Sequence, residues 1–200
     1  MIIHLVAEGY MEEAVARRLL PFCGHQLGPV VYGKQGFQFI RANAAKFHPL
    51  ATGHSGVMVL TDFRDPKVVC LTAALQEYVW DKLPTPPRSF LCIFSVNELE
   101  SWFLADRRGL PKFFGIAVSD LPPHPQAEPL PKKTLVSLAR AARKSVIRDG
   151  LAPPPGHGGL LGRKYNAIMY DFVANYWNIE AAMNRAPSLE RCVRRLRELT

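Results

Sequence analysis

Residues 56–65 read GVMVLTDFRD, and this stretch decides the fold that we expect. The continuous apolar run over 56–60 is typical of a strand that is covered on both faces of a parallel sheet. Two acids, Asp62 and Asp65, follow the run, and Pro66 occupies a position that suits the first turn of a helix. The pattern therefore predicts a buried strand, an acidic turn and a helix, in that order.

Two further apolar runs lie on either side of this strand in the sequence. Residues 2–7 read IIHLVA and residues 90–96 read FLCIFSV, while residues 29–33 are a candidate for another short strand. Apolar residues at helical spacing follow the first run and also separate the central run from the last. Strands that alternate with helices predict an α/β fold, with a mostly parallel sheet flanked by helices.

Acidic residues follow each of the three long strands. Parallel strands bring their carboxyl ends to one edge of a sheet, where ligands bind in open α/β folds. Carboxylate oxygens suit a hard cation such as Mg²⁺ or Mn²⁺. Alternatively, the helix macrodipole stabilises acids at helix N-termini in any protein, so a purely structural role stays open. The acids expected at this edge are Glu8, Asp62, Asp65, Glu98 and Glu100.

The chain changes character in its second half. Five prolines within residues 122–131 predict an extended segment, so we expect an α/β core over 1–121 and a basic, helical subdomain over 122–200 that packs on it. One helix is expected over 132–148, with Val146 on its apolar face, and others over about 164–176 and 188–199. Asn97 is expected to cap a helix that follows the last strand.

The positive charge is confined to this second half. The chain carries 25 Lys and Arg against 17 Asp and Glu; the first hundred residues hold nine of each, and the second hundred hold sixteen against eight. A one-sided basic field indicates a polyanionic partner such as nucleic acid, although solvated surface charge is the alternative. The cations expected to contact nucleic acid are Arg64, Arg140, Arg143, Lys144, Arg163 and Lys164.

Composition excludes several classes of protein. No apolar run approaches the roughly 20 residues of a membrane-spanning helix, and the N-terminal stretch lacks a signal peptide's basic leader. The four cysteines stand far apart without metal-binding spacing, as expected of buried thiols in a reducing compartment, so the cytoplasm is the expected location.

Three segments carry a resemblance to a known family: VAEGYMEEAVARRLLP, VLTDFRD and FSVNELESWFLAD. In order and spacing they resemble the Toprim-like family encoded beside AAA-type ATPases, which is related to the nuclease domain of the overcoming-lysogenization-defect proteins. The closing segment, from GRKYNAIMYDF onward, is similar to that family's helical tail.

This resemblance implies a Toprim-like site. It assigns Glu8 as general acid/base or ligand and Asp62 as the first aspartate of a pair that holds Mg²⁺. The second position of the pair is Arg64 here, and Asp65 lies one residue further on. Glu98 and Glu100 match a Glu-x-Glu motif of the family, and Asp106 matches a later acid.

The resulting expectation is a Mg²⁺- or Mn²⁺-dependent nuclease that acts with a separately encoded AAA-type ATPase in defence against phage. Glu8, Asp62 and Lys164 form its expected catalytic set, and the five acids above are its expected metal ligands. Arg64 motivates a second hypothesis, a non-catalytic nucleic-acid-binding or regulatory subunit with a degenerate metal site. A third is a protein-interaction scaffold whose charge serves solubility.

Overall fold

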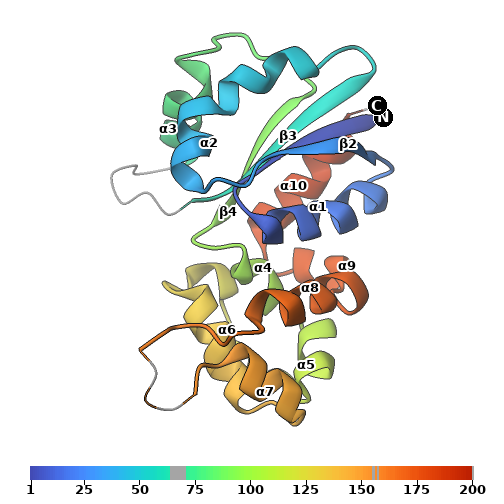
Figure 1. The fold of residues 1–200 in the computed structure, drawn as a ribbon. Helices are drawn as coiled ribbons and strands as arrows, with labels where there is room; N and C mark the ends of the chain where they lie inside the picture. The colour runs from blue at the N-terminus through green and yellow to red at the C-terminus, as the bar shows by residue number, and fades with distance from the viewer. Residues whose placement is uncertain (64–70, 155, 157, 200) are drawn as a thin grey trace. The chain divides into compact units, whose positions relative to one another are not determined.

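The computed structural model describes residues 1–63, 71–154, 156 and 158–199, drawn in Figure 1. These residues form two compact units. The first unit contains residues 1–96 together with 191–200, and the second contains residues 97–190. The division therefore falls at Val96 rather than after residue 121, and the last ten residues return to the first unit.

A parallel sheet of four strands is the centre of the first unit. The strands are β1 (Ile2–Ala7), β2 (Gln26–Gly33), β3 (Ser55–Phe63) and β4 (Phe90–Val96), in the spatial order β2-β1-β3-β4. Every strand pair is parallel. The α/β fold with a parallel sheet is thus confirmed, and the apolar run over 56–60 forms a central strand, as predicted.

Helices pack on the apolar faces of this sheet. The helix α1 (Tyr10–Phe22) follows β1 and buries Val15, Leu19 and Leu20. The other face is covered by segments that include α2 (Phe37–Asn43), the 3-10 helix η1 (Ala44–Leu50), α3 (Leu71–Leu75) and the π-helix η2 (Gln76–Trp80). The strands contribute buried side chains to the hydrophobic cluster on this face, among them Val6, Val59, Cys92 and Phe94. Both faces of the central strands are therefore buried, which explains why their sequences are apolar without alternation.

The C-terminal helix α10 (Pro187–Arg197) completes the first unit from Arg191 onward. His25 Nε2 lies 2.7 Å from the carbonyl oxygen of Leu196, and the Arg197 guanidinium lies over the Phe22 ring at 5.0 Å. Val193 and Leu196 are buried. Residues of α10 are thus part of the same hydrophobic core as α1 and β1.

The second unit is helical and has an aromatic core. Phe103, Phe113, Phe172 and Trp177 contact one another in this core, and Trp102 Nε1 donates a hydrogen bond to Ser188 Oγ at 2.7 Å. Its elements are α4 (Glu100–Leu104), α5 (Gly109–Phe114), the 3-10 helices η3 (Val118–Asp120) and η4 (Pro125–Ala127), α6 (Pro131–Arg140), α7 (Ser145–Leu151), α8 (Tyr165–Asn175) and α9 (Ile179–Met183).

The helix expected over 132–148 is two helices, α6 and α7. The break between them changes the helical phase, so Val146 is 67% exposed and Ile147 is buried instead. Asn97 does not cap a helix, because α4 begins at Glu100 and Leu99 is its N-cap residue. Asn97 instead has a positive φ of 63°, and its side-chain amide donates to the carbonyl oxygens of Gln126 and Glu128. No helix among the described residues is long and apolar enough to cross a membrane.

The ends of β1 and β2 meet at a glycine. Gly33 has a φ of +85°, and a Cβ atom on it would lie 2.4 Å from the carbonyl oxygen of Ala7. The same Ala7 oxygen accepts a hydrogen bond from the Lys34 backbone N–H at 2.7 Å. This close approach fixes the backbone immediately before Glu8.

We expect Gly33→Ala to lower the free energy of unfolding by about 2–4 kcal/mol, because a left-handed φ and a steric overlap with Ala7 act together. Gly24→Ala is the matched control, because Gly24 has a similar φ of +83° but no atom within 4 Å of the added Cβ. Urea denaturation measures both. Equal losses of stability in the two variants would contradict the close approach.

Candidate functional site

Glu8 lies at the carboxyl end of β1, beside the end of β3. Its backbone N–H donates to the carbonyl oxygen of Leu60 at 3.2 Å, which continues the ladder between the two strands. Its carboxylate oxygen Oε2 accepts from the Thr61 hydroxyl at 2.7 Å and from the Asp62 backbone N–H at 3.2 Å. Neighbouring strands therefore fix the position of this carboxylate.

Asp62 lies inside β3 rather than after it. The register pairs it with Ser95 of β4, and the Ser95 hydroxyl donates to Asp62 Oδ1 at 2.5 Å. Asp62 is only 3% exposed. Because the Asp62 backbone N–H donates to Glu8 Oε2, the Glu8 carboxylate lies beside the backbone of Asp62 at the carboxyl edge of the sheet. The side chains of Thr61 and Asp62 point to opposite faces of β3, so Glu8 is held on the face of Thr61 and the Asp62 carboxylate lies on the face of Ser95.

Thr61 and Ser95 were not among the predicted site residues, yet their hydroxyls hold the two acids. Both are fully buried. A signal for Ser95 exists in the sequence: it is the one hydroxyl residue in the otherwise apolar run FLCIFSV. A buried polar residue near the end of such a strand requires a partner, and here the partner is Asp62.

The donor set of Glu8 and Asp62 suits Mg²⁺ or Mn²⁺ in a limited way. Both supply hard oxygen donors, and Mg²⁺ is often held by one or two carboxylates together with waters and substrate phosphates. Within residues 1–63, 71–154, 156 and 158–199, no group of three or more His, Cys, Asp or Glu side chains is arranged to hold a metal ion. A metal at this edge would thus depend on its substrate for further ligands. Arg64 and Asp65 lie outside the described residues.

Glu98 and Glu100 belong to the second unit. Glu98 Oε2 accepts from the Lys132 backbone N–H at 2.8 Å. Glu100 is 2% exposed; its Oε1 accepts from the Tyr165 hydroxyl at 2.7 Å and lies 3.3 Å from Lys132 Nζ. These contacts tie α4 to α6 and α8. They give both glutamates a structural role, while their assignment as metal ligands stays a prediction.

Asp106 also has a structural role. It is fully buried, and its carboxylate accepts from the backbone N–H groups of Arg108, Gly109 and Asn178 at 2.8–2.9 Å. Burial raises the pKa of Asp106, and the three backbone hydrogen bonds oppose that effect. This aspartate joins the start of α5 to the start of α9.

The three cysteines that the structure describes lie in surroundings that suppress thiol reactivity. Cys92 and Cys192 are buried, Cys23 is half-buried, and Cys70 lies outside the described residues. Burial raises the pKa of Cys92 to about 12 and also raises the pKa values of Cys23 and Cys192. Because the thiolate is the nucleophile, these three cysteines are inert structural side chains near neutral pH.

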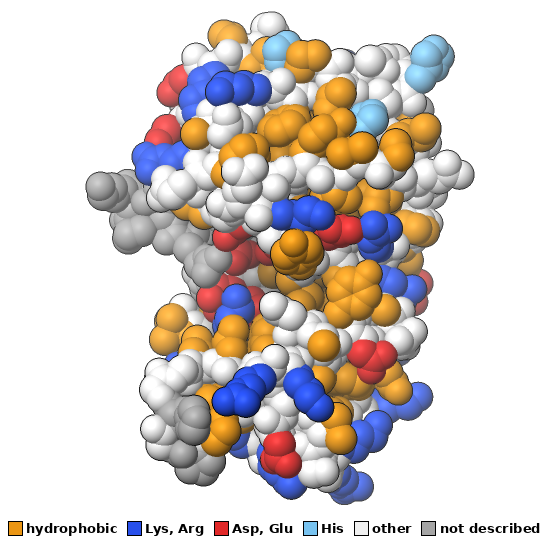
Figure 2. Space-filling model, viewed as in Figure 1, with side chains coloured by type: hydrophobic (Ala, Val, Ile, Leu, Met, Phe, Trp, Pro, Cys, Tyr) orange, Lys and Arg blue, Asp and Glu red, His pale blue; other side chains and the backbone are white. Residues whose placement is uncertain are grey.

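The predicted phosphate-binding cations lie on the surface of the second unit. Lys and Arg side chains stand out over its helices on the face shown in Figure 2. Arg140 ends α6, Arg143 and Lys144 lie in the break before α7, and Arg163 and Lys164 precede α8. All five are exposed, as expected of side chains that contact a polyanion.

No protein-family model, curated protein or solved structure matches the chain. The resemblance to the Toprim-like family therefore stays a prediction.

The structural role of Glu100 is testable through Tyr165. We expect Tyr165→Phe to lower the free energy of unfolding by about 1–3 kcal/mol, because it removes a hydrogen-bond donor from a buried carboxylate. Tyr170→Phe is the control, since Tyr170 lies in the same helix and is 46% exposed. If urea denaturation shows no difference between the two variants, the Tyr165–Glu100 contact contributes nothing to stability.

Proposed function

We propose that the first unit binds Mg²⁺ or Mn²⁺ through Glu8 and Asp62 and hydrolyses phosphodiester bonds of nucleic acid. The observation that carries the proposal is the position of the Glu8 carboxylate at the carboxyl ends of β1 and β3, where the Thr61 hydroxyl and the Asp62 backbone N–H both donate to it. This is the edge of an open parallel sheet at which ligands bind.

The chain's own residues would orient this chemistry. The Ser95 hydroxyl holds one oxygen of Asp62, and the Thr61 hydroxyl and the Asp62 N–H hold one oxygen of Glu8. Carboxylates fixed in this way need little reorganisation when a ligand arrives. When bound, a divalent cation supplies Lewis-acid activation of the phosphate and of the attacking water.

The resemblance extends this proposal to a partner and a setting. On that ground alone, we propose that the protein acts with a separately encoded AAA-type ATPase, in defence against phage, in the cytoplasm. We also propose that the Lys164 side chain binds a phosphate of the nucleic acid.

The proposal predicts that Glu8→Ala and Asp62→Asn each weaken Mn²⁺ binding and nucleic-acid cleavage by at least ~100-fold, since even residues that only support metal ligands contribute about 10–100-fold. Calorimetric titration with Mn²⁺ and cleavage of labelled DNA and RNA give the two readouts. Asp171→Asn is the control, because Asp171 is an exposed acid of α8. Cleavage by Glu8→Ala at the wild-type rate would overturn the assignment.

A second candidate function is nucleic-acid binding without catalysis. It is favoured by the engagement of Glu8 Oε2 with two protein donors and by the lack of a three-ligand metal group among the described residues. In this function the exposed cations of the second unit contact phosphates.

If the cations contact phosphates, the affinity for single-stranded DNA in EDTA should fall with salt, with a log–log slope of about −0.7 for each phosphate that they neutralise. Replacing Arg140 and Arg143 by Gln should make that slope shallower by about 0.7 for each phosphate that is no longer neutralised. Fluorescence anisotropy over a salt series measures both slopes. Binding that is absent, or that does not depend on salt, would instead favour the protein-interaction scaffold.

A further inference from the structure

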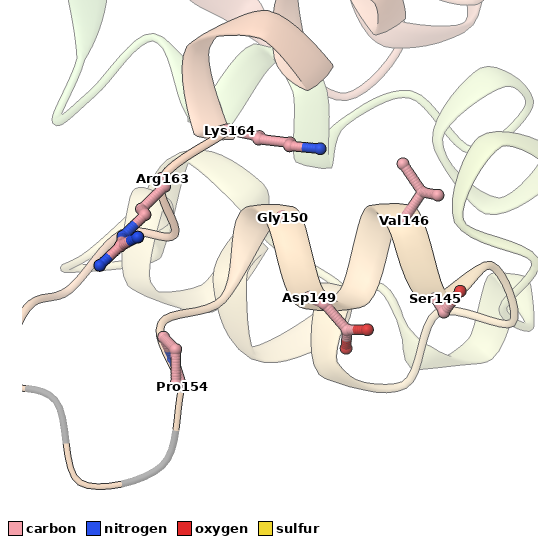
Figure 3. A pocket seen from close by; sticks show the side chains of 7 residues that line it. All are labelled: Ser145, Val146, Asp149, Gly150, Pro154, Arg163 and Lys164. Carbon is pink, nitrogen blue, oxygen red and sulfur yellow. The ribbon is translucent and has the colours of Figure 1, made fainter.

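A pocket of about 560 Å³ lies in the second unit between α7 and the segment that leads into α8. Figure 3 shows its lining from close by. Its volume lies within the range of roughly 300–1,000 Å³ that is typical of small-molecule sites. The lining residues are Ser145, Val146, Asp149, Gly150, Pro154, Arg163 and Lys164.

Backbone contacts build this pocket. The N–H groups of Gly162 and Lys164 donate to the carbonyl oxygens of Leu151 and Gly150 at 2.8 and 3.1 Å. A Cβ atom on Gly162 would lie 2.3 Å from the Gly150 oxygen, so the approach requires glycine. The segment is therefore held against the end of α7, and Arg163 and Lys164 are placed at the pocket before any ligand arrives.

The two cations lie on different sides of the pocket. In Figure 3 the Lys164 side chain extends along α7 in the direction of Val146, whereas Arg163 lies on the side of Pro154. Neither side chain has a hydrogen-bond or ion-pair partner in the part of the chain that the structure describes. Asp149 is the single acid of the lining, and its Oδ1 lies 3.2 Å from Arg148 Nε. The pocket therefore offers two positive charges, from Arg163 and Lys164, and one negative charge, from Asp149, which forms an exposed ion pair with Arg148.

A second pocket of about 410 Å³ adjoins the first, because both include Asp149 and Pro154 in their linings. It contributes two more cations, Arg140 and Arg148, together with apolar surface from Ala152 and Pro153. The two pockets thus bring four cationic side chains and one acid to a small region. Val146 and Pro154 add apolar surface to the lining of the first pocket, Val146 on the side of Lys164 and Pro154 on the side of Arg163.

We propose that the first pocket binds one nucleoside that carries a phosphate on each side. Its phosphates would pair with Lys164 and Arg163, and its base would lie on Val146. The adjoining pocket would receive the next phosphate at Arg140. A nucleotide within a single strand and a free nucleoside 3′,5′-bisphosphate share this chemistry. This inference rests on the proposed function only in taking the ligand to be a nucleotide or nucleic acid. The binding that it describes requires neither a metal ion nor catalysis.

Calorimetric titration in EDTA tests this inference on the full-length protein, with thymidine 3′,5′-bisphosphate, thymidine 5′-monophosphate, inorganic phosphate and an oligothymidylate as probes. We expect the bisphosphate to bind at least about tenfold more tightly than the monophosphate, because it makes one more charge-assisted contact. The double variant Arg163→Gln, Lys164→Gln should weaken bisphosphate binding by at least about tenfold. Val146→Asn should weaken bisphosphate binding and leave the affinity for inorganic phosphate unchanged.

The matched control is the double variant Lys112→Gln, Lys133→Gln, which removes the same charge from exposed positions that line neither pocket. It should bind the bisphosphate as the wild type does. Oligothymidylate that binds more tightly than the bisphosphate, and that Arg163→Gln, Lys164→Gln weakens, assigns the pocket to nucleic-acid strands. Equal binding of the two probes, weakened by the same variant, assigns it to free nucleotides. Both results support the inference. Unchanged bisphosphate binding in Arg163→Gln, Lys164→Gln would overturn it, as would inorganic phosphate that binds as tightly as the bisphosphate.

Glu8→Ala separates this inference from the proposed function. If the pocket is correct, Glu8→Ala binds the bisphosphate with wild-type affinity, whatever happens to cleavage. If Arg163→Gln, Lys164→Gln binds the bisphosphate normally while Glu8→Ala loses cleavage, the proposed function stands and the pocket does not.

Discussion

The parallel pairing of β1 with β3, and of β3 with β4, is the constraint on which the candidate site depends. Its register places Ala7 beside Leu60 and Asp62 beside Ser95. A shift of one residue in either pair would turn the side chains at the strand ends to the opposite face. Buried apolar residues on both faces oppose such a shift, so the core itself fixes the positions of Glu8 and Asp62 at the strand ends.

The sequence predicted the parts of the fold that hydrophobic burial determines. The runs that became β1, β3 and β4 are apolar because both faces of these strands are covered, and they were found within a few residues of their true ends. The break between α6 and α7 was missed because the apolar spacing from Leu135 to Ala142 continues to Val146, although the helix does not. The role of Asn97 was missed because its partners, the carbonyl oxygens of Gln126 and Glu128, are distant in sequence.

The acids of the candidate site could be predicted from the sequence, but the hydroxyl groups of Thr61 and Ser95 that hydrogen-bond to them could not. Glu8 and Asp62 were found because strand ends in a parallel sheet meet at one edge. Sequence position alone could not distinguish these acids from Glu100 and Asp106, whose buried carboxylates satisfy a tyrosine hydroxyl and backbone N–H groups.

The positive charge is distributed differently between the two structural units than between the two halves of the sequence. The first unit carries 13 Lys and Arg against 8 acids, and the second carries 12 against 9. Both units are therefore basic, because the arginines of α10 belong with the sheet.

The return of residues 191–200 to the first unit has a consequence for biosynthesis. The contact of His25 with Leu196 joins residues 171 positions apart, and α10 buries Val193 and Leu196 in a core that the first strand begins. The second unit is inserted between Val96 and Arg191. During translation it therefore leaves the ribosome before the core of the first unit is complete. Contacts so far apart in sequence form slowly, since a long loop must close first. The nascent sheet therefore remains uncovered at its α10 site until the residues of α10 have left the ribosome.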